Sequence, residues 1–179
     1  VVGRVRYRKD TDRIIKNKIK YILNKLSLKE NISNYTFIDF GSGFGDILYE
    51  LRNFFNILYG IECDKYSYNK SKQKLEEYKH ITLINDKIEN VNINHSNIIL
   101  YMYEPLWTMK NCEKRYNMYN KIIDNINYKN LYIIYVEGSK ITNMCNFNNN
   151  INDKFSLIYS YNVNTWPLNK KIYIYKNNN

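Results

Sequence analysis

Hydrophobic positions along the chain follow two alternating patterns. Apolar residues spaced three or four apart, such as Ile15, Ile19 and Ile22, predict an amphipathic helix with Asp10–Thr11–Asp12 as its N-cap residues. Short apolar runs lie between such stretches and predict buried strands. Strands are expected at residues 35–40, 56–62, 81–84, 97–103 and 131–136, and helices around residues 47–55, 67–78 and 119–126. This alternation predicts a doubly wound parallel sheet.

The end of the chain departs from this alternation. Phe155–Tyr161 and Lys171–Tyr175 read as two consecutive strands, joined by a segment that contains Trp166 and Pro167. Two strands without a helix between them predict an antiparallel pair at one edge of the sheet. We therefore expect an α/β fold with a doubly wound, mostly parallel seven-stranded sheet and an antiparallel terminal strand pair. Residues 1–179 are expected to form one domain, in which 1–30 precede a core of 31–179.

The chain is basic, with a net charge of +10 and a pI near 9.3. A basic surface attracts nucleic acid or an acidic protein. Alternatively, the lysines follow from composition, because Ile, Lys, Asn and Tyr abound while Ala is absent. No apolar run reaches the roughly 18–20 residues of a membrane helix, and no apolar segment follows the basic N-terminus. We therefore expect neither a membrane partner nor a signal peptide.

The cysteines and histidines show no pattern that indicates a structural site. Cys63, Cys112 and Cys145 are far apart and odd in number, so no disulfide scaffold is expected and an intracellular location fits better. His80 and His95 form no metal-binding spacing with one another or with the cysteines. No metal is expected.

A glycine-rich segment, Asp39 to Gly45 (DFGSGFG), separates the first predicted strand from the next helix. Glycines allow a sharp turn and a close approach of a ligand to backbone N–H groups. The start of the following helix favours an anionic group. Asp46 stands where the dinucleotide fingerprint requires its third glycine, and no Lys-Ser follows as in a phosphate loop. The segment predicts a cofactor loop.

With this G-x-G-x-G spacing after an acid, the sequence resembles the class I S-adenosylmethionine-dependent methyltransferase family, whose first motif is (D/E)-x-G-x-G-x-G. The resemblance extends from about residue 10 to the end of the chain. It implies that the backbone of 41–45 holds the amino-acid part of S-adenosylmethionine and that Asp39 holds the loop and the cofactor's amino group. Phe44 and Asp46 depart from residues common in the family, but neither occupies a glycine position.

Two further acids follow predicted strands. Glu62 ends the second strand, where a carboxylate can accept two hydrogen bonds from ribose hydroxyls. Dinucleotide enzymes use such an acid too, and a solvated cap is the alternative; Asp64 is the fallback if the strand ends later. Asp86 follows the third strand, where the family has an acid near the adenine amino group, with Ile88 available to pack on the ring. A surface Asn-Asp turn is the alternative for Asp86.

The segment after the fourth strand, Glu104-Pro105-Leu106-Trp107, resembles the (D/N/S)-P-P-(Y/F/W) motif of amine-directed methyltransferases. The departures are Glu104, in place of a shorter acid or amide, and Leu106, in place of the second proline. Glu104 would accept hydrogen bonds from an incoming amine, and Trp107 would stack on a base or cover a cation. The alternative is a proline turn with Trp107 in the core.

The basic segment before the first helix, residues 4–9, is a second candidate for contact with the acceptor. It could fold over the cofactor so that Tyr7 caps the site, or remain a solvated terminus. Together, the expected site comprises catalytic, acceptor-binding and cofactor-binding residues. The catalytic residues are Glu104 and Trp107, the acceptor-binding residues Tyr7, Pro105 and Trp107, and the cofactor-binding residues Asp39, Phe40, Gly41, Ser42, Gly43, Gly45, Glu62, Cys63, Asp86, Lys87 and Glu104.

The resemblance implies an enzyme that transfers a methyl group from S-adenosylmethionine to a nitrogen. A macromolecule, either protein (lysine) or nucleic acid, is the expected acceptor. A catalytically silent module that keeps the fold and binds the cofactor or nucleic acid is the alternative. A nicotinamide oxidoreductase is disfavoured by the glycine spacing and by the terminal strand pair.

Overall fold

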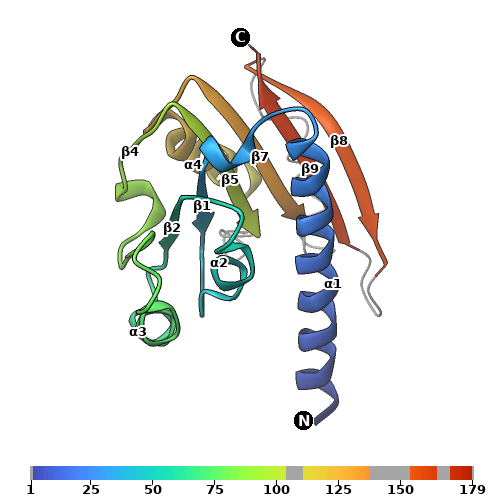
Figure 1. The fold of residues 1–179 in the computed structure, drawn as a ribbon, viewed down its shortest axis with the longest axis vertical. Coiled ribbons are helices and arrows are strands. Elements are labelled where there is room, and N and C mark those ends of the chain that lie inside the picture. The colour runs from blue at the N-terminus through green and yellow to red at the C-terminus, as the bar shows by residue number, and fades with distance from the viewer. Residues whose placement is uncertain (1, 104–110, 138–153, 165–169, 179) are drawn as a thin grey trace.

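A seven-stranded sheet forms the centre of the protein, for which a computed structural model describes residues 2–103, 111–137, 154–164 and 170–178 (Figure 1). The strand order is β3-β2-β1-β5-β7-β9-β8. The first five strands are parallel, and β9 runs antiparallel to both β7 and β8. This confirms the predicted sheet. The strands are β1 (Thr36–Phe40), β2 (Ile57–Ile61), β3 (Ile81–Ile84), β5 (Asn97–Tyr103), β7 (Asn130–Glu137), β8 (Phe155–Val163) and β9 (Lys170–Asn177).

Helices cover both faces of this sheet. They are α1 (Val2–Ser27), α2 (Asp46–Leu51), α3 (Lys65–Leu75) and α4 (Cys112–Asp124), with short 3₁₀ turns at Ile32–Asn34 and Ile88–Asn90. Figure 1 shows the long α1 running along the half of the sheet that contains β9 and β8. A small parallel pair, β4 (Ile93–Asn94) and β6 (Ile126–Asn127), was not predicted.

Two apolar cores lie on opposite faces of the sheet. Phe37 packs with α1 and α2 residues in one core, whereas its neighbour Ile38 packs with α4 residues in the other. Adjacent side chains of a strand point to opposite faces, so a strand covered on both sides needs apolar residues throughout. Residues 98–102 of β5 are all buried for this reason.

Several element boundaries differ from the predictions, and three of the differences are informative. Helix α1 begins at Val2, because Asp10–Thr11–Asp12 can continue a helix as well as cap one and no proline precedes them. Helix α2 ends at Leu51, so the buried Phe55 lies beyond the helix. Ile126 belongs to β6 and not to α4. Phe55 and Ile126 are apolar because they are buried, and their spacing from the helix residues resembled a helical pattern although neither lies in a helix.

One cysteine also differs from expectation. Cys112, at the start of α4, is disulfide-bonded, whereas Cys63 is free and exposed. The sequence predicted only that the cysteines form no disulfide scaffold, and it did not single out Cys112 as a bonded residue. Sequence spacing could not reveal it, because a disulfide depends on side chains that the fold brings together.

A helix that spans a membrane must be both long and apolar. None of the described helices is both long enough and apolar enough to cross a bilayer.

Candidate cofactor site

The glycine loop joins the carboxyl end of β1 to the start of α2. Gly41, Gly43 and Gly45 have φ values of 85°, 52° and 72°, in the left-handed region that favours glycine. The N–H groups of Gly41 and Ser42 donate to the Ile61 carbonyl at 2.9 and 3.0 Å. The end of β2 therefore holds the first turn of the loop in place.

The last two glycines serve different purposes. A Cβ on Gly45 would lie 2.5 Å from Ser71 Oγ and 2.7 Å from Leu75 Cδ1, so this glycine lets the loop pack closely on α3. A Cβ on Gly43 would meet nothing within 4 Å. Gly43 therefore borders open space, where a ligand can approach the backbone.

A cavity of about 190 Å³ lies against this loop. It sits at the carboxyl ends of β1 and β5, where the strand order reverses and ligands bind in such sheets. Besides Asp39, three of its lining residues were predicted from the sequence as cofactor ligands, namely Gly41, Ser42 and Gly43. The lining residues are Asp12, Ile15, Lys16, Asp39, Gly41, Ser42, Gly43, Phe44, Asp46, Ile47, Tyr101 and Tyr103.

Asp39 is the most unusual charged group of the cavity. It is 2% exposed, and the strand register places it beside Gly60 of β2 and Tyr101 of β5. Burial, and then the nearby Glu62 charge, raise the pKa of Asp39 well above its ordinary value. Among the described residues, none forms a hydrogen bond or ion pair with its carboxylate. A cation entering the cavity would stabilise the ionised form.

A second polar group of the cavity wall lacks a partner. Ser42 is 7% exposed, and its Oγ forms no hydrogen bond with the described part of the chain. This oxygen is itself buried and lies near Gly60 of β2, where an added Cβ would approach it to 3.0 Å, so the hydroxyl is packed between the loop and the sheet.

Tyr101 and Tyr103, which lie two residues apart near the end of β5, also line the cavity but were not predicted as site residues. Burial, followed by the charges of Asp39, Tyr103 and Asp12, raises the pKa of Tyr101 well above its ordinary value. The Tyr101 hydroxyl therefore stays protonated and can donate a hydrogen bond. Residues two apart in a strand lie on the same face, so the predicted strand at 97–103 already placed Tyr101 and Tyr103 on one face.

Glu62 follows β2, as predicted, and its carboxylate is half-buried. Its Oε2 accepts the Gly43 N–H at 2.9 Å, and its Oε1 accepts the Asp64 N–H at 2.8 Å. Each carboxylate oxygen can accept another hydrogen bond, so Glu62 can still bind hydroxyls. The fallback residue, Asp64, caps α3 by accepting the Ser67 N–H at 2.8 Å.

The predicted adenine region lies beyond the cavity, at the exposed end of β3. Asp86 Oδ1 accepts the Lys87 N–H at 2.6 Å and the Asn90 side-chain amide at 2.9 Å, which is the turn geometry named as its alternative. Asn85 Nδ2 donates to the Glu62 carbonyl at 2.8 Å. This bond places the Asp86 segment next to the end of β2, where Glu62 and Cys63 lie.

Some predicted site residues are placed elsewhere. The Phe40 side chain is 1% exposed and packs in the core on the opposite face, so only its backbone borders the loop. Ile88 is likewise a core residue. Tyr7 lies within α1, where the backbone alone is described. Glu104, Pro105, Leu106, Trp107, Trp166 and Pro167 lie outside the described residues.

In the described ranges, no three His, Cys, Asp or Glu side chains gather where they could hold a metal ion.

Comparison with solved structures shows the fold. N-methyltransferase NodS from Bradyrhizobium japonicum WM9 has a TM-score of 0.72 at 10% identity, covering 95% of this chain and 98% of its own. Magnesium protoporphyrin IX methyltransferase (ChlM) from Synechocystis PCC 6803, solved with bound SAM, has a TM-score of 0.72 at 14% identity, covering 96% and 84%. An rRNA methylase from Streptococcus thermophilus has a TM-score of 0.58 at 14% identity, covering 82% and 89%.

At the level of sequence, neither a protein-family profile nor a curated protein matches the chain. The structural likeness is nevertheless extensive and agrees with the strand order. The protein has the class I methyltransferase-like fold.

Proposed function

We propose that this protein is an S-adenosylmethionine-dependent methyltransferase. The observation that carries the proposal is the buried Asp39 carboxylate, which has no partner within the described residues and lines a cavity against the glycine loop. An isolated buried carboxylate is costly unless a cation neutralises it, and the amino group of the cofactor is such a cation. Two structural neighbours with this fold are solved with SAM or S-adenosylhomocysteine, which supports the same cofactor for this chain.

The residues around the loop suit the separate parts of this cofactor. Asp39 would bind the ammonium group, and the amino-acid part of the cofactor would lie against the glycine loop beside Gly43, which borders open space. Glu62 would accept hydrogen bonds from the ribose hydroxyls, and the Asp86–Lys87 turn would contact the adenine. When bound, the cofactor supplies an electrophilic methyl group on a sulfonium.

The acceptor we propose is a nitrogen of a nucleic acid or of a protein lysine. Glu104 and Trp107 follow β5 in the chain, and β5 ends at the cavity. Glu104 would accept hydrogen bonds from the amine and from the cofactor, while Trp107, Pro105 and Tyr7 would position the acceptor. Methyl transfer needs an in-line approach and a dry site, so orientation by these side chains would supply most of the rate enhancement.

A methyl-transfer assay with a Glu104→Ala variant tests this proposal. The protein is incubated with methyl-labelled S-adenosylmethionine and with RNA, DNA or histone-like protein in separate reactions. We expect label in one of these pools, and about a 100-fold slower transfer by the variant, with cofactor binding retained. Glu113→Ala, which removes an exposed acid from the first turn of α4, is the matched control and should transfer normally.

Two results would count against the proposal in different ways. Cofactor binding without transfer to any pool would favour the catalytically silent module. Normal transfer by Glu104→Ala would show that the role assigned to this side chain is wrong while the methyltransferase activity stands.

A further inference from the structure

Lysine and tyrosine side chains form a stripe along the solvent side of α1. Lys18, Tyr21 and Lys25 follow one another at spacings of three and four residues, which places them on one helix face. Tyr21 is 43% exposed, whereas Ile19 and Ile22 beside it are buried in the core. The stripe is therefore separate from the apolar face that holds α1 on the sheet.

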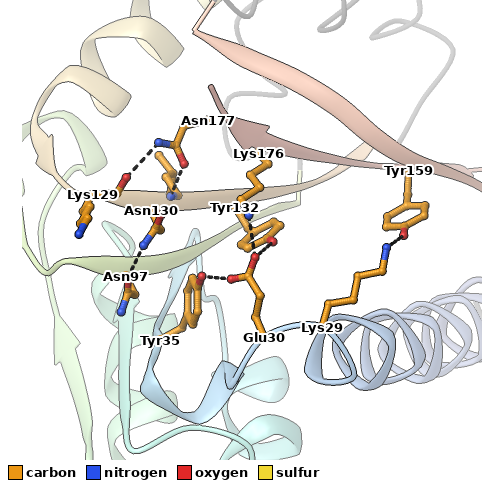
Figure 2. Close-up of polar contacts among 11 residues, drawn as sticks. Lys29, Glu30, Tyr35, Asn97, Lys129, Asn130, Tyr132, Tyr159, Lys176 and Asn177 are labelled. Carbon is orange, nitrogen blue, oxygen red and sulfur yellow. Dashed lines mark hydrogen bonds and ion pairs between the residues drawn. The ribbon is translucent and has the colours of Figure 1, made fainter. Parts of the chain in front are cut away.

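Two tyrosines of the edge strand β8 extend this stripe. The Lys18 ammonium lies 4.6 Å from the ring centre of Tyr21 and 4.4 Å from that of Tyr161. The Tyr21 and Tyr161 rings meet edge to face at 6.3 Å. Lys29 donates to the Tyr159 hydroxyl at 2.7 Å, as Figure 2 shows. We call Lys18, Tyr21, Lys25, Lys29, Tyr159 and Tyr161 the α1–β8 patch.

The charge of this patch is not neutralised by neighbouring acids. No Asp or Glu occurs between Arg13 and Lys29, nor in β8 or β9. Within the described ranges, Lys18, Lys25 and Lys29 form no ion pair with a carboxylate. The nearest acid in the chain, Glu30, is already bound by Lys176, Tyr132 and Tyr35 (Figure 2).

We propose that the α1–β8 patch binds single-stranded nucleic acid. Its lysines would contact phosphates, and its partly exposed tyrosine rings would stack on bases, the combination that single-strand binding surfaces use. A duplex hides the faces of its bases, so it would engage the lysines alone. An acidic protein would also engage only the lysines. The interleaved rings therefore favour a single strand.

The patch is continuous with the cavity through α1. Asp12, Ile15 and Lys16 of this helix line the cavity, and Lys18 follows within the next turn. A strand bound along the patch would thus reach the cavity rim. That the strand carries the methyl acceptor rests on the proposed function, whereas the binding itself does not depend on methyl transfer.

Fluorescence anisotropy with a labelled single-stranded RNA of about 12 nucleotides tests the binding without cofactor. The triple variant Lys18→Gln, Lys25→Gln, Lys29→Gln should bind at least about tenfold more weakly. Its slope of log affinity against log salt should fall by about 2, since each lost phosphate contact removes about 0.7. The control variant Lys72→Gln, Lys79→Gln, Lys121→Gln removes the same charge from α3, the segment after α3, and α4, and should keep most of the affinity.

Stacking is tested separately by Tyr21→Leu with Tyr161→Leu. Loss of base stacking should weaken binding about tenfold or more and leave the salt slope unchanged. Single-stranded DNA of the same sequence should bind comparably, since the patch contacts only phosphates and base faces.

Three results would overturn the proposal. The first is that the control triple variant loses as much RNA affinity as the patch triple variant. The second is that a blunt duplex binds as tightly as the single strand, and the third is that polyglutamate binds as tightly as RNA. Calorimetry with S-adenosylmethionine on the same variants keeps the two proposals apart. Patch variants that bind both the cofactor and RNA as tightly as wild type would contradict only the patch proposal. A wild-type protein without affinity for the cofactor would contradict only the proposed function.

Discussion

At the scale of single residues, burial of the Asp39 carboxylate opposes folding, and we propose that the same carboxylate binds the ammonium group of the cofactor. Its position in the first glycine motif made it predictable as a cofactor ligand. Its burial and its proximity to Glu62 were not predictable, because they depend on how strands β1 and β2 align. Tyr101 and Lys16 were missed for the same reason: they reach the cavity from elements distant in sequence.

Replacing Asp39 by Asn should stabilise the unliganded protein and weaken cofactor binding. Because the pKa of Asp39 is raised in the folded state, its contribution to stability is full below pH about 3.8 and lost as pH rises through the folded value. Urea unfolding at pH 7 should therefore show Asp39→Asn more stable by about 1–3 kcal/mol, and the gain should shrink toward pH 4.

The same variant should bind S-adenosylmethionine about 10- to 100-fold more weakly, since a charge-assisted hydrogen bond to the ammonium is lost. Asp64→Asn is the matched control, because asparagine caps a helix as well as aspartate does. A destabilised Asp39→Asn protein, or one with undiminished affinity, would contradict the role given to this carboxylate.

Alanine at Gly45 and Gly43 should separate folding from binding. Gly45→Ala places a methyl group against Ser71 and Leu75 at a positive φ, and should lower the free energy of unfolding by about 2–4 kcal/mol. Gly43→Ala should cost only the backbone strain, about 1 kcal/mol, but should reduce cofactor affinity because its methyl group enters the cavity side. Equal stability losses in urea unfolding would show that the Gly45 contact with α3 is unimportant.

At the scale of elements, Glu30 ties the end of α1 to the sheet. Figure 2 shows its carboxylate between Tyr35, Tyr132 of β7 and Lys176 of β9. The Lys176 Nζ donates to Glu30 Oε1 at 2.6 Å. Burial raises the pKa of Glu30, but hydrogen bonds from Lys176, Tyr132 and Tyr35 outweigh it, so the pKa is lowered overall. This contact joins elements more than 100 residues apart in the chain, so no local pattern could predict it.

Glu30→Gln should therefore destabilise the protein in a pH-dependent way. A lowered folded pKa means that the ionised carboxylate contributes stability above its unfolded value of about 4.5, and that this is lost as pH falls through the folded value. At pH 7 the variant should lose about 1–3 kcal/mol in urea unfolding, and the difference from wild type should vanish in acid.

Glu50→Gln is the control for this substitution. Glu50 pairs with Lys20 at a site where about a third of each side chain is exposed, so its loss should cost under about 0.5 kcal/mol. A pH-independent loss for Glu30→Gln would indicate that its shape, and not its charge, holds α1.

At the scale of the whole molecule, the alternating pattern predicted the sheet well. The continuous apolar run of β5 matched its observed bounds, Asn97–Tyr103, because a central strand must be apolar on both faces. The predicted ends of α2 and α4 were wrong, since burial of Phe55 and Ile126 outside helices imitates helical spacing. The β4–β6 pair is too short, at two residues per strand, to leave a pattern.

The central claim is that the cavity against the glycine loop binds S-adenosylmethionine, and calorimetric titration tests it most directly. We predict that S-adenosylmethionine and S-adenosylhomocysteine bind and that NAD does not. We also predict that binding releases protons near the raised pKa of Asp39, which makes the measured heat depend on the buffer. Absence of binding by both sulfur cofactors, or binding of NAD in their place, would contradict the account.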